Sequence, residues 1–224
     1  MPARPLLLVG AGGLARETVE LVRAINRERR SWDLLGLLDD SPELHGREIL
    51  GVPVLGPCTA AGDFPQAQVV ACVASPDDPL RRLRLVERLR LPRRRYATLV
   101  HPRAVIPASA RIGPGSILQA DVVLTADVWI GAHVAVMPAV VLTHDDVVGD
   151  GVSFGAGARV SGGVTIDSGA YVGSGALLRE RIASGSGAVV GMGAVVTRAG
   201  PPGEIWIGAP ARRARGQGRL EAVG

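Results

Sequence analysis

Residues 130–160 read IGAHVAVMPAVVLTHDDVVGDGVSFGAGARV, and a bulky apolar residue recurs in them at every sixth position. The spacing extends on both sides, from Ile106 to Val196, and only Ser184 interrupts it. An α-helix repeats every 3.6 residues and a half-buried strand every two, so a period of six indicates a short strand followed by a tight turn. Three such units make a triangular coil of about 18 residues, which predicts a β-helix of about five coils.

The repeat fills only the second half of the 224 residues, which favours more than one domain. We expect a first domain over residues 1–100, the repeat domain over 101–200, and a C-terminal strand and tail over 201–224. The first domain begins with an apolar run, a glycine turn and a helical pattern. Alternating β and α segments follow up to a last strand at residues 96–100, which predicts a small parallel sheet.

Composition narrows the possible functions. All 25 residues counted as Lys plus Arg are arginine, which excludes lysine Schiff bases and phosphate-binding lysines of the Walker type. The net charge is +4, but residues 104–197 carry four Arg against seven acids, and only 3% of the chain is aromatic. We therefore expect no nucleic-acid partner.

The two cysteines and the hydropathy predict the compartment. Cys58 and Cys72 lie outside the repeat and lack the spacing of metal ligands, so we expect free thiols in a reducing environment. The sequence contains no run of 18 apolar residues and begins with no recognisable leader. These features predict a cytoplasmic protein without a membrane partner.

The glycine turn at residues 10–15, GAGGLA, opens a helix, and its backbone amides can approach a phosphate because no Cβ blocks them. The next apolar segment ends in Asp39 and Asp40, which can accept hydrogen bonds from a ribose or a base. The pattern predicts a nucleotide or nucleotide-sugar site; the alternative is a turn that only packs a helix on a strand. The arginines of residues 81–95 form a solvated helix face or contact phosphate.

Six motifs occur in a fixed order along the chain: GAGG at residues 10–13, LDD at 38–40, GVPVLG at 51–56, HPRAVI at 101–106, LTHDDVVG at 142–149 and GAPA at 208–211. The ordered set resembles the PglD/NeuD family of bacterial sugar acyltransferases over nearly the whole chain. The resemblance implies a fold of class α/β plus β, with a left-handed parallel β-helix behind a Rossmann-like domain. It also implies a homotrimer that uses acetyl-CoA to N-acetylate a nucleotide-linked sugar, favouring a UDP-4-amino sugar.

Acyl transfer to an amine needs a base, and histidine is the natural one near neutral pH. Of the four histidines, His45 and His101 lie outside the repeat, His133 lacks an adjacent acid, and His144 precedes Asp145 and Asp146 at an outward corner. Either acid could orient the imidazole, although such a histidine is also compatible with an ordinary surface position. Gly162 follows His144 by 18 residues, one full coil, and stacks on the same corner.

The resemblance assigns roles to residues at matching positions. His144 corresponds to the base, Asp145 to its orienting acid and the Gly162 amide to the oxyanion donor. The residues implied for the nucleotide sugar are Gly12, Gly13, Leu14, Asp39, Asp40, Val73 and Ala74. Those implied for acetyl-CoA are Ser153, Gly162, Ser174 and Met192, with no metal.

Three positions depart from the family pattern, and Ser153 is the most informative. Leu14 and Ser153 replace common histidines, and Ala74-Ser75 replaces Gly-Asn. Because Ser153 lies nine residues after His144, half a coil away, the two could share a pocket only across a subunit interface. A serine there can still hydrogen-bond a thioester carbonyl or a pantetheine amide. Arg212, Arg213 and Arg215 contact the CoA phosphates or belong to a solvated tail.

Three other functions compete with N-acetylation. A sugar O-acetyltransferase of the sialic-acid type would use the same machinery, and a trimer that binds nucleotide sugar without turnover would share the fold. A zinc carbonic anhydrase uses the same coil architecture but needs three histidine ligands, and only His133 and His144 lie in the repeat.

Overall fold

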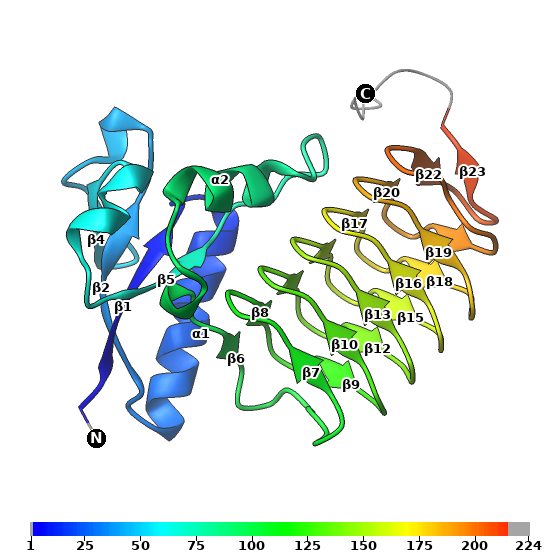
Figure 1. The fold of residues 1–224 in the computed structure, drawn as a ribbon, viewed down its shortest axis with the longest axis horizontal. Helices are drawn as coiled ribbons and strands as arrows, with labels where there is room; N and C mark the ends of the chain where they lie inside the picture. Colours follow the sequence, from blue (N-terminus) through cyan, green and yellow to red (C-terminus); the bar gives the residue numbers. More distant parts are fainter. Residues whose placement is uncertain (1, 215–224) are drawn as a thin grey trace.

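The structure, a computed structural model, describes residues 2–214. The end of the expected tail, Arg215 included, lies outside the described residues. Figure 1 shows an α/β unit beside a column of stacked coils, with the chain passing once from one to the other. Among the described residues, no helix has the length and apolar character needed to cross a membrane.

The N-terminal unit is a five-stranded sheet in the order β3-β4-β2-β1-β5, parallel except for the β3–β4 pair. Its strands are β1 (Arg4–Val9), β2 (Trp32–Leu38), β3 (Glu48–Ile49), β4 (Val52–Gly56) and β5 (Gln68–Ala71). Its helices are α1 (Gly13–Glu28) and α2 (Arg81–Leu89), with 3-10 turns η1 (Pro42–Leu44), η2 (Cys58–Asp63) and η3 (Arg93–Arg95). The expected strand, glycine turn and helix are therefore present.

The expectation of a last strand of this sheet at residues 96–100 is wrong. Tyr96 makes only an isolated bridge to Val69, and β6 (Leu99–Val100) instead pairs in parallel with β8 (Ile117–Leu118) of the column. An apolar run at the end of a domain fits either neighbouring sheet equally well. The sequence pattern therefore could not indicate which sheet these residues join.

The column consists of three parallel sheets that form the faces of a triangular prism. The first face continues from β6 and β8 through β11 (Ala135–Val136), β14 (Ser153–Phe154), β17 (Tyr171–Val172), β20 (Val189–Val190) and β22 (Ile205–Ile207) to β23 (Arg212–Arg213). The second has β9 (Val123–Leu124), β12 (Val141–Leu142), β15 (Arg159–Val160), β18 (Leu177–Leu178) and β21 (Val195–Val196). The third has β7 (Arg111–Ile112), β10 (Trp129–Ile130), β13 (Val147–Val148), β16 (Thr165–Ile166) and β19 (Ala183–Ser184).

The six-residue pattern determines the interior of this column. In the two-residue strands from β8 to β21 the second residue is buried in the interior. Leu142 and Phe154 are fully buried, and even Ser184 is almost completely covered. Paired strands lie one coil apart in the sequence, as in the pairs Trp129↔Val147 and Ser153↔Tyr171. The prediction of a parallel β-helix is confirmed.

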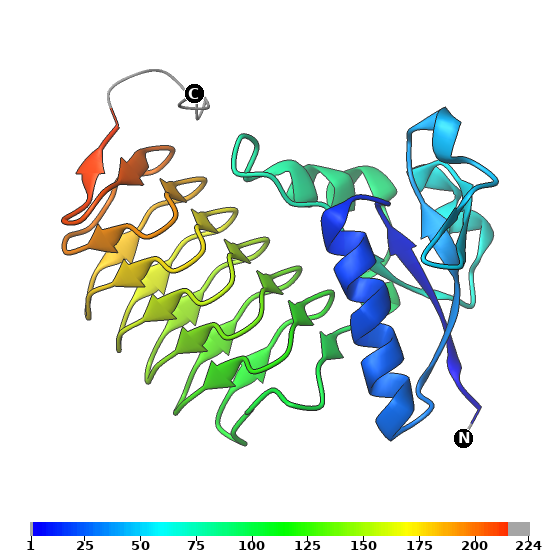
Figure 2. The ribbon, with the colours of Figure 1, turned by 180° about the vertical axis from the view of Figure 1, so that it is seen from behind.

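The two units share a core. One buried cluster runs from β1 and α1 through Leu99 to Ile117 and Ala135, on the first face of the column. Figure 2 shows α1 lying between the N-terminal sheet and the coils. Because apolar side chains fill this junction, residues from the glycine turn and from the first face are held at a fixed separation.

The column ends in an antiparallel hairpin. β22 pairs in parallel with β20 and antiparallel with β23, and Trp206 of β22 is buried. The short strand expected at residues 205–207 is therefore confirmed.

Candidate functional site

His144 lies in the turn between β12 and β13, at the corner of the second and third faces. Its Nδ1 lies 2.8 Å from Oδ2 of Asp145. The side chains are 66% and 68% exposed, so the pair is accessible to a substrate. Asp145 occupies the left-handed region at φ 62°, which places its carboxylate beside the preceding ring, and an aspartate tolerates this conformation better than most residues.

Gly162 lies directly under this imidazole, one coil further along the column. A Cβ at Gly162 would lie 2.3 Å from Nε2 of His144, so any other residue would displace the ring. The neighbouring Gly163 amide donates to the carbonyl of His144 at 2.8 Å. Within residues 2–214 no acceptor pairs with the Gly162 amide, which leaves it free to donate to a ligand.

Asp146 belongs to the same corner but points inward and is fully buried. Its carboxylate accepts the amide of Thr143 at 2.8 Å and that of Val164 at 2.9 Å, and so ties the His144 turn to the Gly162 turn. Burial raises its pKa from 3.8 to about 7, although both amides act in the opposite direction. The sequence pattern indicated Asp146 only as a possible partner of the imidazole and did not predict this role.

A cavity of about 370 Å³, the interdomain cavity, separates the start of α1 from the first face of the column. It brings together five residues expected at the site: Gly13, Leu14, Ala74, Ser153 and Ser174. Other lining residues were missed, among them Glu17 and Tyr171. Partial burial raises the pKa of Glu17, which stands one helical turn after the glycines. Its position in the GAGGLARE segment was a possible signal.

Two expected residues lie elsewhere. Met192 is 83% exposed and does not line this cavity. His144 does not line it either, because the cavity opens on the first face whereas His144 occupies the opposite corner of the prism. Within one chain, His144 and Gly162 are therefore apart from the other residues expected to bind the two substrates.

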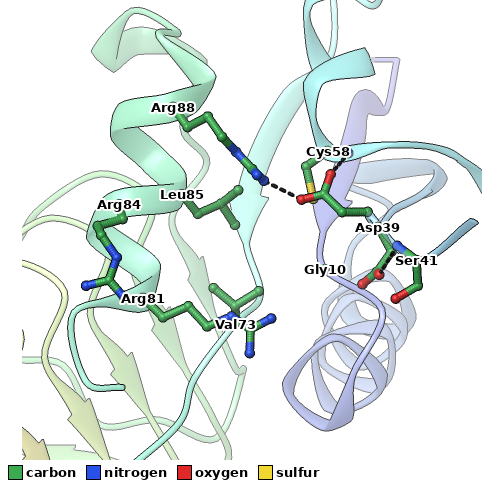
Figure 3. A pocket seen from close by; sticks show the side chains of 10 residues that line it. Gly10, Asp39, Ser41, Cys58, Val73, Arg81, Arg84, Leu85 and Arg88 are labelled. Carbon is green, nitrogen blue, oxygen red and sulfur yellow. Dashed lines mark hydrogen bonds and ion pairs between the residues drawn. The ribbon is translucent and has the colours of Figure 1, made fainter. Parts of the chain in front are cut away.

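A second cavity, of about 290 Å³, lies at the carboxyl ends of β1 and β2 and is bounded by α2 (Figure 3). At the base of this cavity, the Asp39 carboxylate accepts hydrogen bonds from the backbone amides of Ala11 and Ser41. Asp40 accepts the Cys58 amide at 3.0 Å and pairs with Arg88. Partial burial would raise the pKa of Asp40, but these two partners outweigh it and lower the pKa. Asp39, Asp40 and Val73, which were expected to bind the nucleotide sugar, thus line one cavity.

Arginines of α2 form the opposite wall of this second cavity. Arg81, Arg84 and Arg88 all line it, and Figure 3 shows Arg81 directed toward Val73 and Arg88 reaching across to the carboxylate. Gly12 and Gly13 at the start of α1 have open space where a Cβ would stand. The cavity combines donors for phosphate oxygens with acceptors for ribose or base groups.

The remaining candidate groups do not form a site. His133 is buried, its ring packs edge-on against Tyr96, and burial lowers its pKa to about 4. In the part of the chain that the structure describes, no three His, Cys, Asp or Glu residues lie close enough to hold a metal ion. Arg213 pairs with Glu204 at the end of the column, and Arg212 is exposed beside it.

Solved structures match the chain over nearly its full length. The acetyltransferase domain of PglB from Neisseria gonorrhoeae, in complex with acetyl coenzyme A, is 29% identical with a TM-score of 0.82; the match covers 95% of this chain and 100% of that one. A histidine mutant of perosamine N-acetyltransferase from Caulobacter crescentus, in complex with CoA and GDP-perosamine, is 27% identical with a TM-score of 0.82, covering 94% and 96%. WeeI from Acinetobacter baumannii is 30% identical with a TM-score of 0.79, covering 93% and 99%.

The shared fold confirms the left-handed hand of the β-helix and the Rossmann-like unit before it. No protein-family model matches the chain, and no curated protein does.

Proposed function

Because the chain belongs to the hexapeptide-repeat family of bacterial sugar acetyltransferases, we propose that it transfers the acetyl group of acetyl-CoA to the amino group of a nucleotide-linked sugar. The observation that carries the proposal is the corner at which the imidazole of His144 is paired with Asp145 on one nitrogen and stands over Gly162 with the other. A base and a free backbone donor on one accessible edge are what acyl transfer to an amine requires.

His144 acts as the general base in this proposal. With Nδ1–H donated to Asp145, Nε2 carries a lone pair that takes the proton from the attacking amine as the new C–N bond forms. The Gly162 amide donates to the oxygen that becomes negative at the thioester carbon. The C–S bond then breaks, the CoA sulfur takes the proton from the imidazolium, and an amide and a free thiol are released.

The two cavities divide the binding of the substrates. The second cavity, with Asp39, Asp40 and the α2 arginines, fits a nucleoside diphosphate. From there the sugar extends over Gly12 and Gly13 toward the interdomain cavity, where Leu14 and Ala74 form one wall. Ser153 and Ser174 form the other wall, against which the pantetheine arm of acetyl-CoA lies, with Met192 further along the same corner.

We propose a homotrimer, because one chain alone does not complete the site. The interdomain cavity lies between α1 and the first face, and His144 lies on the corner opposite that face. In a ring of three prisms, the His144 corner of one chain can meet the cavity of the next. The two buried free thiols, Cys58 and Cys72, fit a reducing compartment, so the proposal places the reaction in the cytoplasm.

Release of free thiol from acetyl-CoA tests the function. The purified protein is assayed with a panel of UDP- and GDP-linked 4-amino sugars and with their 4-hydroxy counterparts as O-acetylation substrates. We expect turnover with an amino sugar and a loss of about 10²- to 10⁴-fold in kcat for His144→Ala, as for removal of a general base.

His101→Asn serves as the control, since His101 lies near the junction and away from both cavities. It should retain the rate of the unmodified protein. Full activity of His144→Ala would overturn the assignment of the base, and absence of thiol release with every sugar would overturn the function.

A further inference from the structure

Arg82 is the one fully buried cation among the described residues, with 2% of its surface exposed. It belongs to the first turn of α2 and projects into the junction between the N-terminal unit and the column. Its Nε donates to the carbonyl of Val73 at 2.9 Å. Its Nη1 donates to the carbonyls of His133 and Val152, at 2.9 and 3.3 Å, on the column side.

The fourth bond of this guanidinium is of a different kind. Nη2 donates to the hydroxyl oxygen of Ser153 at 3.0 Å. No carboxylate pairs with Arg82 within residues 2–214, and burial lowers its pKa to about 10, so the group stays charged at neutral pH. Burying a cation without a counter-ion is costly. The three backbone carbonyls do not require a cation, because water or an N–H group of the chain could donate to them instead.

The chemistry of the two side chains restricts the partners of the Ser153 hydroxyl hydrogen. A guanidinium carries only donors, so it occupies a lone pair of the hydroxyl oxygen and cannot accept the hydroxyl hydrogen. None of the described residues accepts that hydrogen either. Ser153 lines the interdomain cavity, so its hydroxyl hydrogen is available to a group that occupies that space.

We propose that Arg82 is a positioning residue, which fixes the Ser153 hydroxyl as a donor to a carbonyl oxygen of the acyl donor, either the thioester or a pantetheine amide. This inference rests on the proposed function. The neighbouring positive charge also strengthens the donor, because a hydroxyl that accepts from a cation becomes a better proton donor itself. Arg82 and Ser153 together would then do the work of a single polar side chain at this position.

A double-mutant cycle tests the coupling. Ser153→Ala, Arg82→Lys and the double variant are compared by KM and kcat for acetyl-CoA, and by calorimetric titration with acetyl-CoA and with CoA. A lysine keeps the charge but has a shorter reach and lacks the planar fork. We expect each single change to raise the KM for acetyl-CoA about tenfold, the double variant to be no worse than either, and the KM for nucleotide sugar to stay within twofold.

The titrations identify the acceptor. A loss of affinity for acetyl-CoA but not for CoA indicates the thioester carbonyl, whereas an equal loss for both indicates a pantetheine amide. Arg95→Lys is the matched control, because Arg95 also donates to backbone carbonyls, those of Ala61, Phe64 and Ala67, but lies away from the cavity. It should lower the melting temperature without changing the KM for acetyl-CoA.

Two results would overturn the proposal while leaving the function intact. One is an active Arg82→Lys variant whose KM for acetyl-CoA is unchanged when that of Ser153→Ala rises. The other is a double variant in which the increase in KM for acetyl-CoA equals the product of the increases in the two single variants. A protein that neither binds nor cleaves acetyl-CoA would instead overturn the proposed function, and this inference with it.

Discussion

At the scale of single residues, the corner at His144 depends on Gly162 and Asp146 as well as on the imidazole itself. Gly162 gives the imidazole of His144 its space, since a Cβ there would stand 2.3 Å from Nε2. Asp146 replaces the small apolar residue that most coils carry at its position, and its carboxylate joins the two turns through the amides of Thr143 and Val164. The stability of this hydrogen-bond network therefore depends on the protonation state of the buried Asp146 carboxyl group.

Asp146 predicts a pH dependence of stability. Burial raises its pKa from 3.8 to about 7, so between these values the folded protein holds a proton that the unfolded chain has released. The stabilisation is complete below pH 4 and is lost as the pH rises through 7, by at most about 4 kcal/mol. We therefore expect the free energy of unfolding, from urea titrations at pH 5 to 8, to fall with pH in the parent protein more steeply than in Asp146→Asn.

Asp150→Asn is the control for this measurement. Asp150 also accepts a backbone amide, that of Ala132 at 2.7 Å, but its side chain is exposed. Its pH profile should run parallel to that of the parent. If the Asp146→Asn profile is parallel as well, the carboxylate does not titrate as its burial implies.

At the scale of elements, the sequence predicted what depends on local pattern and missed what depends on contacts between distant segments. The six-residue period was sufficient to predict the strands of the column, because the position of each inward residue depends only on its own coil. The glycine turn was sufficient to predict where α1 begins. The pairing of β6 and the burial of Arg82 arise only where the two units meet, and no pattern in the sequence indicates them.

The candidate site divides in the same way. The His144 corner could be predicted because stacking one coil on the next places residues 18 apart on the same edge. The arginines of α2 could not, since a solvated face and a phosphate-binding face have the same composition. Only the placement of α2 against the carboxyl ends of β1 and β2 separates the two interpretations.

Helix α2 therefore predicts a specific effect on substrate affinity. Arg81 lines the second cavity and points into it (Figure 3). If it contacts the diphosphate, Arg81→Gln should raise the KM for nucleotide sugar about tenfold and leave that for acetyl-CoA unchanged. Steady-state kinetics with each substrate varied in turn measure both values.

Arg94→Gln provides the comparison, because Arg94 is exposed on η3 and does not line the cavity. It should leave both KM values unchanged. If the Arg81→Gln variant keeps the parental KM for nucleotide sugar, Arg81 does not contact the diphosphate.

At the scale of the whole molecule, a site shared between chains predicts recovery of activity by mixing. His144→Ala lacks the base, and Gly13→Trp fills the interdomain cavity, where the space around Gly13 is open. Each variant alone should be inactive. When they are co-expressed in equal amounts and assemble at random, about a quarter of the sites combine an intact cavity with an intact base from the next chain.

The measurement is thiol release by the mixed protein, with the mass determined by sedimentation. A particle of three chains with about a quarter of the parental activity is expected. A mixture that remains inactive would mean that base and cavity act within one chain. In that case a conformational change within one chain would have to bring His144 and the interdomain cavity together.

The hairpin of β22 and β23 has a consequence for solubility. A stack of parallel strands exposes unpaired amides and carbonyls at its last coil, and another stack could dock there and extend into a fibre. Here the chain reverses direction, and β23 with Arg212 and Arg213 covers the end of the first face by pairing antiparallel with β22, whose Trp206 is buried. Arg213 is paired with Glu204, but Arg212 leaves an exposed positive charge on this edge strand, which disfavours the docking of a second copy and the growth of a fibre.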